Sequence, residues 1–188
     1  MNFEDISSYL KMQGSDKEIE KFFERRVLTS KYILLNEGEI ADRAFLVKKG
    51  CLRSFFYKDG KDITSQFFFE NEVVASAESY FENKPSKCNI ETIEKTVILE
   101  LPKEYYSEII EKIPVLKDMM YIGMQKRLFQ YMDYMRSYIQ DKPVERYLNL
   151  MKTRPEIIQR VPQHYIASYL GMTSVSLSRI RNKIKREG

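Results

Sequence analysis

The residues best suited to chemistry are hydroxyl, amide and cationic side chains near the C-terminus, and the chemistry that they suit is hydrogen bonding to nucleic acid. Such groups match phosphates and base edges. For Arg179 we expect a contact with bases, because a bidentate guanidinium matched to O6 and N7 of guanine is the commonest specific base contact. Lys183 and Lys185 are expected to face phosphates or solvent. One predicted helical face carries Ser174, Ser178, Arg179, Arg181, Asn182 and Lys185.

Two short helices joined by a turn must position these groups. Gly171 stands where a left-handed residue would end the first helix, and Thr173 or Ser174 can accept a hydrogen bond from the free N–H groups that open the second. The pattern predicts a helix-turn-helix. Apolar residues recur at helical spacing on both sides of the turn: Ile166, Ala167 and Leu170 before it, and Leu177, Ile180 and Ile184 after it.

The positive charge of the chain is concentrated at this motif. Residues 160–188 hold six Lys/Arg and one Glu, whereas residues 1–159 hold 25 basic and 26 acidic residues. An ordinary helical hairpin with a solvated cationic face is the alternative, and the charge asymmetry favours nucleic acid over it.

Size and composition bound the fold class. The chain has 188 residues, of which 43% are hydrophobic and 31% charged, which is typical of a soluble globular protein. This length supports one moderate domain plus a small one. No apolar run has the length of a membrane span, and Met1–Leu10 lacks a secretory signal. We expect a mature chain that begins here and stays in the cytoplasm, with no membrane partner.

Cysteine and histidine usage argues against an enzyme. Cys51 and Cys88 are widely separated, so we expect both to be buried as small apolar residues and predict no metal site and no cofactor. His164 is the sole histidine, which disfavours a Ser/His/Asp triad or a multi-histidine metal centre. A structural or phosphate-side role is expected for it.

The N-terminal part is predicted to be mostly β. Residues 2–25 have apolar residues at roughly helical intervals and predict a helical lead-in. From Val27 to Leu101 short runs rich in Val, Ile, Phe and Tyr are separated by turn signals, which indicates an antiparallel sandwich or roll. Asp59-Gly60, between residues 53–57 and 63–69, predicts a tight hairpin.

The sequence after Leu101-Pro102 is predicted to be helical. A short helix is expected over 103–112, and Pro114 suits the first turn of a long helix that reaches about Gln140. Within it a heptad seam indicates a homodimer, although packing against the chain's own sheet stays open because Phe129, Met132 and Ile139 add apolar surface. The seam consists of Tyr121, Met124, Leu128, Tyr131, Met135 and Tyr138.

The remaining breaks set the domain boundaries. Asp141-Lys142-Pro143 predicts a hinge before an amphipathic helix, and Thr153-Arg154-Pro155-Glu156 predicts another break. The expected organisation is α+β: an antiparallel β-roll over 1–113, a long dimerisation helix over 114–140 and a helix-turn-helix domain over 141–188.

This order of elements resembles the Crp/Fnr family of bacterial transcription regulators across nearly the whole chain. Residues 34–39 (LLNEGE) and 45–50 (FLVKKG) resemble an early strand and turn of the family and a strand that ends in Gly, and residues 163–183 are similar to its DNA-binding signature. The resemblance implies a cyclic-nucleotide-binding-like β-roll, a winged-helix/helix-turn-helix domain, a homodimer, and double-stranded DNA and RNA polymerase as partners. It also implies that Ser174 and Val175 read bases, that Ser176 contacts phosphate, and that Arg179 contacts a base. With these, the expected DNA-binding residues are Thr173, Ser174, Val175, Ser176, Ser178, Arg179, Asn182 and Lys183.

The chain departs from the family in the cassette that holds a cyclic nucleotide. Ala75 and Ser76 replace the Gly-Glu pair that opens a short helix in cyclic-AMP-binding members, and Ser86 falls where their phosphate-binding arginine belongs. Lys87 could supply only a point charge. We therefore do not expect cyclic AMP, and we keep the region as a candidate pocket for an unknown small-molecule effector, lined by Ser76, Ser79, Ser86, Lys87 and Asn89.

The oxygen-sensing and haem-sensing branches of the family do not fit either, because no cysteine cluster precedes Cys51 and the roll has no histidine. The expected function is sequence-specific DNA binding in transcription regulation, without enzyme activity. A small-ligand-binding signalling module that acts through a protein partner is the alternative. A cupin-like metalloenzyme is disfavoured, because it needs several converging ligands.

Overall fold

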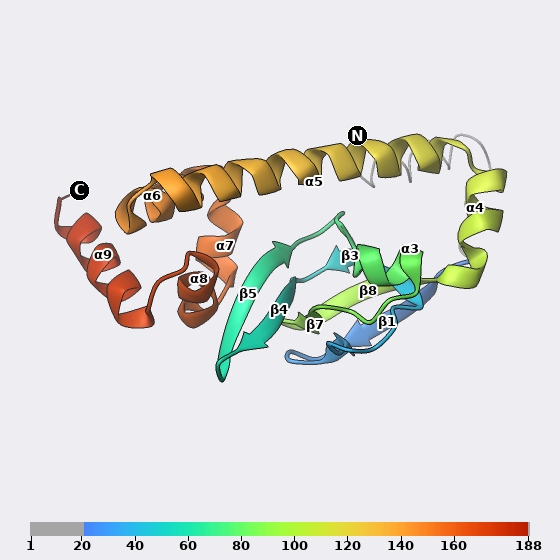
Figure 1. The fold of residues 1–188 in the computed structure, drawn as a ribbon, viewed down its shortest axis with the longest axis horizontal. Coiled ribbons are helices and arrows are strands. Elements are labelled where there is room, and N and C mark those ends of the chain that lie inside the picture. The colour runs from blue at the N-terminus through green and yellow to red at the C-terminus, as the bar shows by residue number, and fades with distance from the viewer. Residues whose placement is uncertain (1–20, 188) are drawn as a thin grey trace. The chain divides into compact units, whose positions relative to one another are not determined.

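Two four-stranded antiparallel sheets build the N-terminal part of the protein (Figure 1). The computed structural model describes residues 21–187. The strand orders are β1-β8-β3-β6 in one sheet and β2-β7-β4-β5 in the other. The elements are β1 (Glu24–Leu28), β2 (Ile33–Leu35), β3 (Arg43–Lys49), β4 (Leu52–Lys58), β5 (Lys61–Phe68), β6 (Val73–Val74), α3 (Ala77–Glu82), β7 (Asn89–Thr92) and β8 (Thr96–Pro102).

Alternating apolar side chains from both sheets share one core. Because successive residues of a strand point to opposite faces, residues two apart share a face. Phe45 and Val47 of β3 are both buried in this way, as is Ile98 of the neighbouring strand β8. The core also contains Leu28, Leu35, Ala41, Leu52, Phe68, Val74, Tyr80 and Ile90. The predicted antiparallel β-roll is therefore confirmed.

The predicted hairpin at Asp59-Gly60 is also confirmed. The two residues separate β4 from β5 and have φ values of 51° and 71°. Positive φ at both central residues is the geometry of a type I′ turn, which matches the twist of the flanking strands.

A buried carboxylate ties three strands of the first sheet together. Glu100 of β8 is fully buried and lies 2.7 Å from Arg26 of β1 and 2.9 Å from Arg43 of β3. Hydrogen bonds to Asp42 and Glu100 raise the pKa of Arg43 above its ordinary value. A buried charge is tolerated because it is paired on both sides.

Helices follow the last strand, much as the sequence predicts. A 3-10 turn (Lys103–Tyr105) leads into α4, and α5 ends at Gln140 as expected. The helices are α4 (Tyr106–Lys112), α5 (Val115–Gln140), α6 (Pro143–Thr153), α7 (Pro155–Arg160), α8 (Gln163–Tyr169) and α9 (Ser174–Glu187). No helix among residues 21–187 is long and apolar enough to cross a lipid bilayer.

Two expectations from the sequence need correction. The helix predicted over 2–25 lies mostly outside the described residues, but its last two positions belong to strand β1, where Arg25 pairs with Leu99 of β8. Residues 103–187 contain no strand, so no wing of the expected winged helix-turn-helix lies within them. The apolar stripe of α9 continues to Ile184, so the helix runs on to Glu187 without a turn that could open a wing.

Packing divides the described chain into two compact units. One unit consists of residues 21–56 and 67–122, and the other of residues 57–66 and 123–187. The tip of the β4-β5 hairpin thus packs within the C-terminal unit. The boundaries expected from the sequence, at 113/114 and 140/141, stay a prediction.

Among the glycines of the roll that the structure describes, Gly50 should tolerate a side chain least. Its φ is +107°, and a Cβ there would lie 2.5 Å from Thr96 Oγ1 and 2.8 Å from Thr96 Cα. We expect Gly50→Ala to lower the free energy of unfolding by about 2 to 5 kcal/mol, from left-handed strain plus overpacking.

The matched control is Gly38→Ala, because Gly38 has φ +91° but a Cβ there would meet no other atom within 4 Å. It should lose only about 1–2 kcal/mol from the backbone term. Urea unfolding of both variants measures the difference, and equal losses would contradict the packing role of Gly50.

Candidate nucleic-acid interface

The turn between α8 and α9 has the geometry that its glycine predicts. Gly171 has φ +65°, its N–H donates to Ser168 O at 3.0 Å, and the N–H of Met172 donates to Ala167 O at 2.9 Å. These two bonds form a Schellman motif, which satisfies free carbonyls at the end of a helix. Helix α8 therefore stops at a defined residue and α9 starts in a defined direction.

Thr173 caps α9. Its Oγ1 accepts a hydrogen bond of 3.1 Å from the N–H of Ser176 and lies 3.0 Å from the Ser176 hydroxyl. This satisfies one of the N–H groups that have no partner inside the helix. Of the two residues predicted as a cap, the structure selects Thr173.

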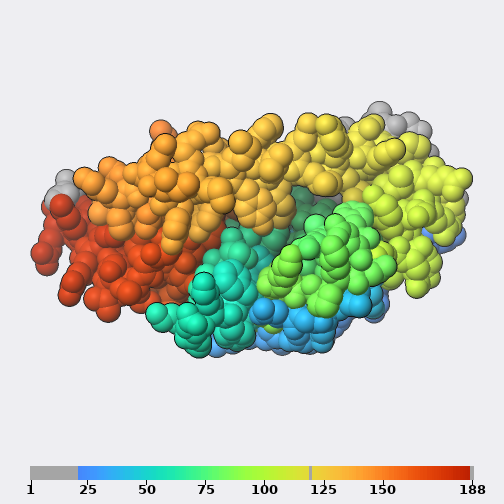
Figure 2. Space-filling model, in the orientation of Figure 1, coloured from blue at the N-terminus to red at the C-terminus, as the bar shows by residue number. Residues whose placement is uncertain are grey.

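One side of α9 is buried and the other is open. Leu177 and Ile180 are buried, and Ile184 is half-buried. The predicted DNA-binding residues are exposed apart from Ser176, which is half-buried. Figure 2 shows the side chains of the α9 segment, in red, at the surface. A shallow hollow on this surface is lined by Arg179, Asn182, Lys183 and Arg186.

Arg179 keeps its donors available. Within residues 21–187 its guanidinium has no hydrogen-bond or ion-pair partner, and the residue is exposed. The hollow that it lines carries two further cationic side chains, those of Lys183 and Arg186, and the Asn182 amide. Such a surface matches phosphates and the edges of bases.

Arg146 of α6 joins the ends of two other helices. Its Nε donates to Leu170 O at the end of α8 (3.1 Å), and its Nη1 donates to Asp141 O just after α5 (3.0 Å). The guanidinium also lies over the ring of Tyr138, 5.1 Å from its centroid. We call these contacts the Arg146 clamp. Cationic donors near helix C-termini stabilise the free carbonyls there.

Tyrosines of α5 complete the support of the turn. A Cβ added to Gly171 would lie 2.5 Å from Cε2 of Tyr138, so the turn packs directly on this ring. The ring of Tyr134 stacks on that of Tyr169 at 5.0 Å, and its hydroxyl donates to Tyr169 O at 2.7 Å. Burial raises the pKa of Tyr134 to about 12, so its hydroxyl keeps the proton that it donates.

All six residues of the predicted seam are exposed by about half or more, and two of them also make contacts within the described chain. Tyr121, Met124, Leu128 and Met135 are exposed, each by more than half. Tyr131 and Tyr138 make contacts within the chain, through a 2.6 Å hydrogen bond to Gln66 and through the Arg146 clamp. Further exposed apolar side chains are Ile122, Phe129, Met132 and Ile139.

The candidate effector residues of the roll mostly have partners inside the chain. Ser86 is buried and its hydroxyl lies 2.9 Å from that of Ser76 and 2.7 Å from Cys88 O. The Ser79 hydroxyl accepts the Ala41 N–H at 2.8 Å.

The last two members of this set differ from each other. Asn89 is buried, accepts the Glu37 N–H at 2.9 Å and donates to Phe55 O at 3.3 Å. Lys87 is exposed and pairs with Glu78 at 2.6 Å, which lowers the pKa of that carboxyl. No single cluster of free polar groups is formed by the five residues.

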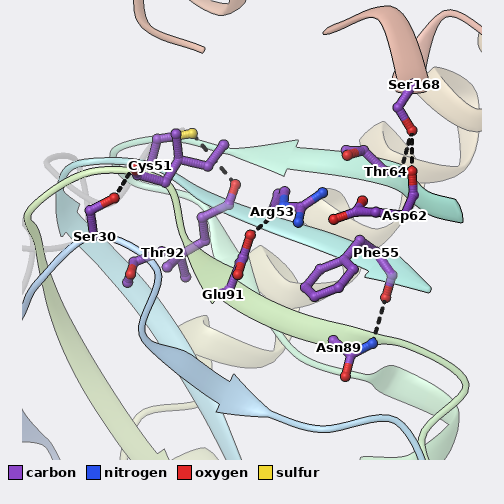
Figure 3. A network of polar contacts seen from close by, with 12 residues as sticks. Ser30, Cys51, Arg53, Phe55, Asp62, Thr64, Asn89, Glu91, Thr92 and Ser168 are labelled. Carbon is purple, nitrogen blue, oxygen red and sulfur yellow. Dashed lines mark hydrogen bonds and ion pairs between the residues drawn. The ribbon is translucent and has the colours of Figure 1, made fainter. Parts of the chain in front are cut away.

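A buried ion pair in the roll escaped prediction from the sequence. The Nε of Arg53 lies 2.6 Å from Oε1 of Glu91, and its guanidinium lies 3.9 Å from the centroid of the Phe55 ring (Figure 3). The two charged residues are direct cross-strand neighbours on β4 and β7. Of the two cysteines, both free, Cys51 is buried as expected and Cys88 is half-buried. Among residues 21–187 no cluster of His, Cys, Asp and Glu could hold a metal ion.

The comparisons with known proteins agree with this fold. Residues 25–113 match the family profile of the cyclic nucleotide-binding domain. The c-di-GMP-responsive global regulator CLP of Xanthomonas campestris has a TM-score of 0.74 and 17% identity, covering 94% of this chain and 93% of that one. FixK2 from Bradyrhizobium japonicum has a TM-score of 0.73 and 18% identity, covering 88% and 86%.

A third structure, assigned to the Crp/Fnr family of transcriptional regulators and from Eubacterium rectale, has a TM-score of 0.71 and 19% identity, covering 93% and 84%. At these identities the structures establish the fold. A comparison with curated proteins found no match.

The Arg146 clamp should stabilise the C-terminal unit. We expect Arg146→Lys to lower its free energy of unfolding by about 2 kcal/mol, because an ammonium cannot reach both carbonyls in the geometry of the guanidinium fork. Arg136→Lys is the control, since Arg136 is 63% exposed and its ion pair with Asp133 spans 3.5 Å. Hydrogen exchange of α8 amides measures the effect, and equal protection in both variants would contradict it.

Proposed function

We propose that this protein is a sequence-specific, double-stranded-DNA-binding transcription regulator of the Crp/Fnr type, without enzyme activity, acting in the cytoplasm. One observation carries the proposal. On the outer side of α9, Arg179 and its cationic neighbours Lys183 and Arg186 are exposed. The order of a cyclic-nucleotide-binding-like roll, a long helix and a helix-turn-helix supports it.

The chemistry of α9 fits the major groove. At the start of the helix Val175 is 60% exposed and could contact a thymine methyl group, with Ser174 beside it. One turn further on, the fork of Arg179 matches O6 and N7 of guanine. Lys183 and Arg186 lie along the same hollow and are placed for phosphates, which fix register without reading sequence.

A second copy of the chain is the proposed partner of α5. Its exposed apolar residues recur at spacings of three and four, which suits the pairing of two helices along a seam. Leu128, Met132, Met135 and Ile139 are each more than half exposed, and clustered apolar surface of this kind, which is typical of association sites, supports the proposal. A two-fold dimer would present two α9 helices to half-sites about 34–36 Å apart.

The proposed effector is not cyclic AMP. Ser76 and Ser86 hydrogen bond to each other, and Lys87 is paired with Glu78, so the cassette offers no bidentate partner for a cyclic phosphate. An unknown small molecule remains the proposed input of the roll, and RNA polymerase the proposed protein partner.

Arg179→Ala should remove base discrimination and leave the fold intact. With an operator selected from random duplexes, we expect the preference for operator over scrambled DNA to fall by about 1–3 kcal/mol, because a bidentate base contact is lost. Fluorescence anisotropy at moderate salt measures this preference. Retained preference would defeat the assignment.

The control for Arg179 is Lys183→Ala on the same face. It should weaken binding to all duplexes alike and reduce the salt slope by about one, as expected for one phosphate contact. A selective loss of the operator alone would contradict the phosphate role.

Leu128→Glu should abolish the dimer. A carboxylate placed in an apolar helix pair is costly to bury, so the chain should sediment as a 22.4 kDa monomer and lose most of its operator affinity. Ile40→Glu, at an apolar residue of similar exposure outside α5, is the control and should leave the dimer intact. A dimer that survives Leu128→Glu would rule out α5 as the seam.

A further inference from the structure

The β4-β5 hairpin contributes the edge strand of its sheet, and a residue of α8 forms hydrogen bonds with that edge. Strand β5 is the last strand of its sheet, with β4 as its neighbour. An edge strand presents main-chain N–H and C=O groups that no further strand pairs. Near the hairpin tip such groups belong to Asp62 and Thr64, and both residues pack within the C-terminal unit.

A single hydroxyl from α8 forms hydrogen bonds with two of these main-chain groups. The Ser168 Oγ donates to Asp62 O at 2.9 Å and accepts the Thr64 N–H at 3.0 Å. Figure 3 shows Ser168 reaching from its helix to both residues of the strand. The C=O of one residue and the N–H of the residue two further on point to the same side of a strand, so the hydroxyl occupies the position that a neighbouring strand would fill.

A second polar contact ties the hairpin to α5. The Tyr131 hydroxyl lies 2.6 Å from Oε1 of Gln66. Thr64 and Gln66 are buried although both are polar. Buried polar groups are accepted where they are hydrogen-bonded, so these contacts satisfy polar groups that the docked arrangement buries.

We propose that Ser168 and Tyr131 form a latch that docks the β4-β5 hairpin on the helix-turn-helix and sets the orientation of α9 relative to α5. The latch rests on the proposed function, because its role is to fix the spacing of the two recognition helices in a dimer. The outer face of α9 is exposed in the latched state, so the latch leaves the reading residues free and acts through orientation.

The polar character of the latch makes it reversible. Hydrogen bonds at an edge strand exchange for hydrogen bonds to water when the surfaces separate, whereas an apolar contact has no such replacement. The hairpin is also continuous along the chain with Arg53 and Phe55 in β4. Displacement of β4 by a ligand or partner would therefore move the hairpin and break its hydrogen bonds to Ser168.

Hydrogen exchange tests the contact without DNA. We expect Ser168→Ala to speed exchange of the Thr64 amide by about tenfold, because its acceptor is removed. Thr153→Ala is the control, since its hydroxyl also donates to a carbonyl, that of Asn149, but does not touch the hairpin. Tyr131→Phe is the second variant. It removes the hydrogen bond to Gln66 and tests the latch if Ser168→Ala fails to fold. Unchanged Thr64 exchange in the folded variants would overturn the latch.

Two duplexes test its role. Loss of the latch should weaken binding to an operator with two half-sites about tenfold, because two loosely oriented α9 helices lose preorganisation, and should leave a single half-site within about twofold. Equal or tighter binding to the two-site operator would overturn the spacing role. If the unaltered protein binds neither duplex, the proposed function fails and the spacing role with it, while Thr64 exchange still decides whether the docking contact exists.

Discussion

The position of α9, and with it the proposed recognition of DNA, depends on the Arg146 clamp. One guanidinium holds the carbonyl that ends α8, a carbonyl just after α5 and the face of the Tyr138 ring. Gly171 packs on that same ring with no space for a side chain. A helix-turn-helix is too small to form a stable core alone. The clamp and the tyrosines of α5 supply the missing support, so the recognition helix starts from a fixed turn.

The long helix α5 therefore has two roles on two sides. One side, with Tyr134 and Tyr138, carries the turn and α8, and the other presents apolar residues such as Leu128 and Met135. In the proposed dimer the same rigid element would pair two chains and orient two recognition helices. The hairpin latch adds a third point of support, so a signal that reaches the hairpin from the roll could change how α9 is presented.

Local signals predicted most of the fold, and non-local contacts escaped prediction. The Asp59-Gly60 turn, the end of α5 and the capped turn at Gly171 depend on neighbouring residues, so their types sufficed. Arg146 and Ser168 act on partners far along the chain, and nothing in their surroundings in sequence marks them. The seam shows the same limit: spacing placed Tyr131 with Leu128, but only the three-dimensional contacts show that its hydroxyl binds Gln66. The predicted helix extends to residue 25 because the apolar residues before it keep a helical spacing. In the structure its last two residues belong to β1 and pair with β8.

Selection of duplexes from a random library tests the central claim most directly. We expect the bound sequences to converge on a palindrome whose half-site centres lie one helical turn, about 10 base pairs, apart, with guanine at a fixed position of each half. Two results would contradict sequence recognition by α9: selected duplexes that share no common sequence, or binding that is lost for every duplex at physiological salt.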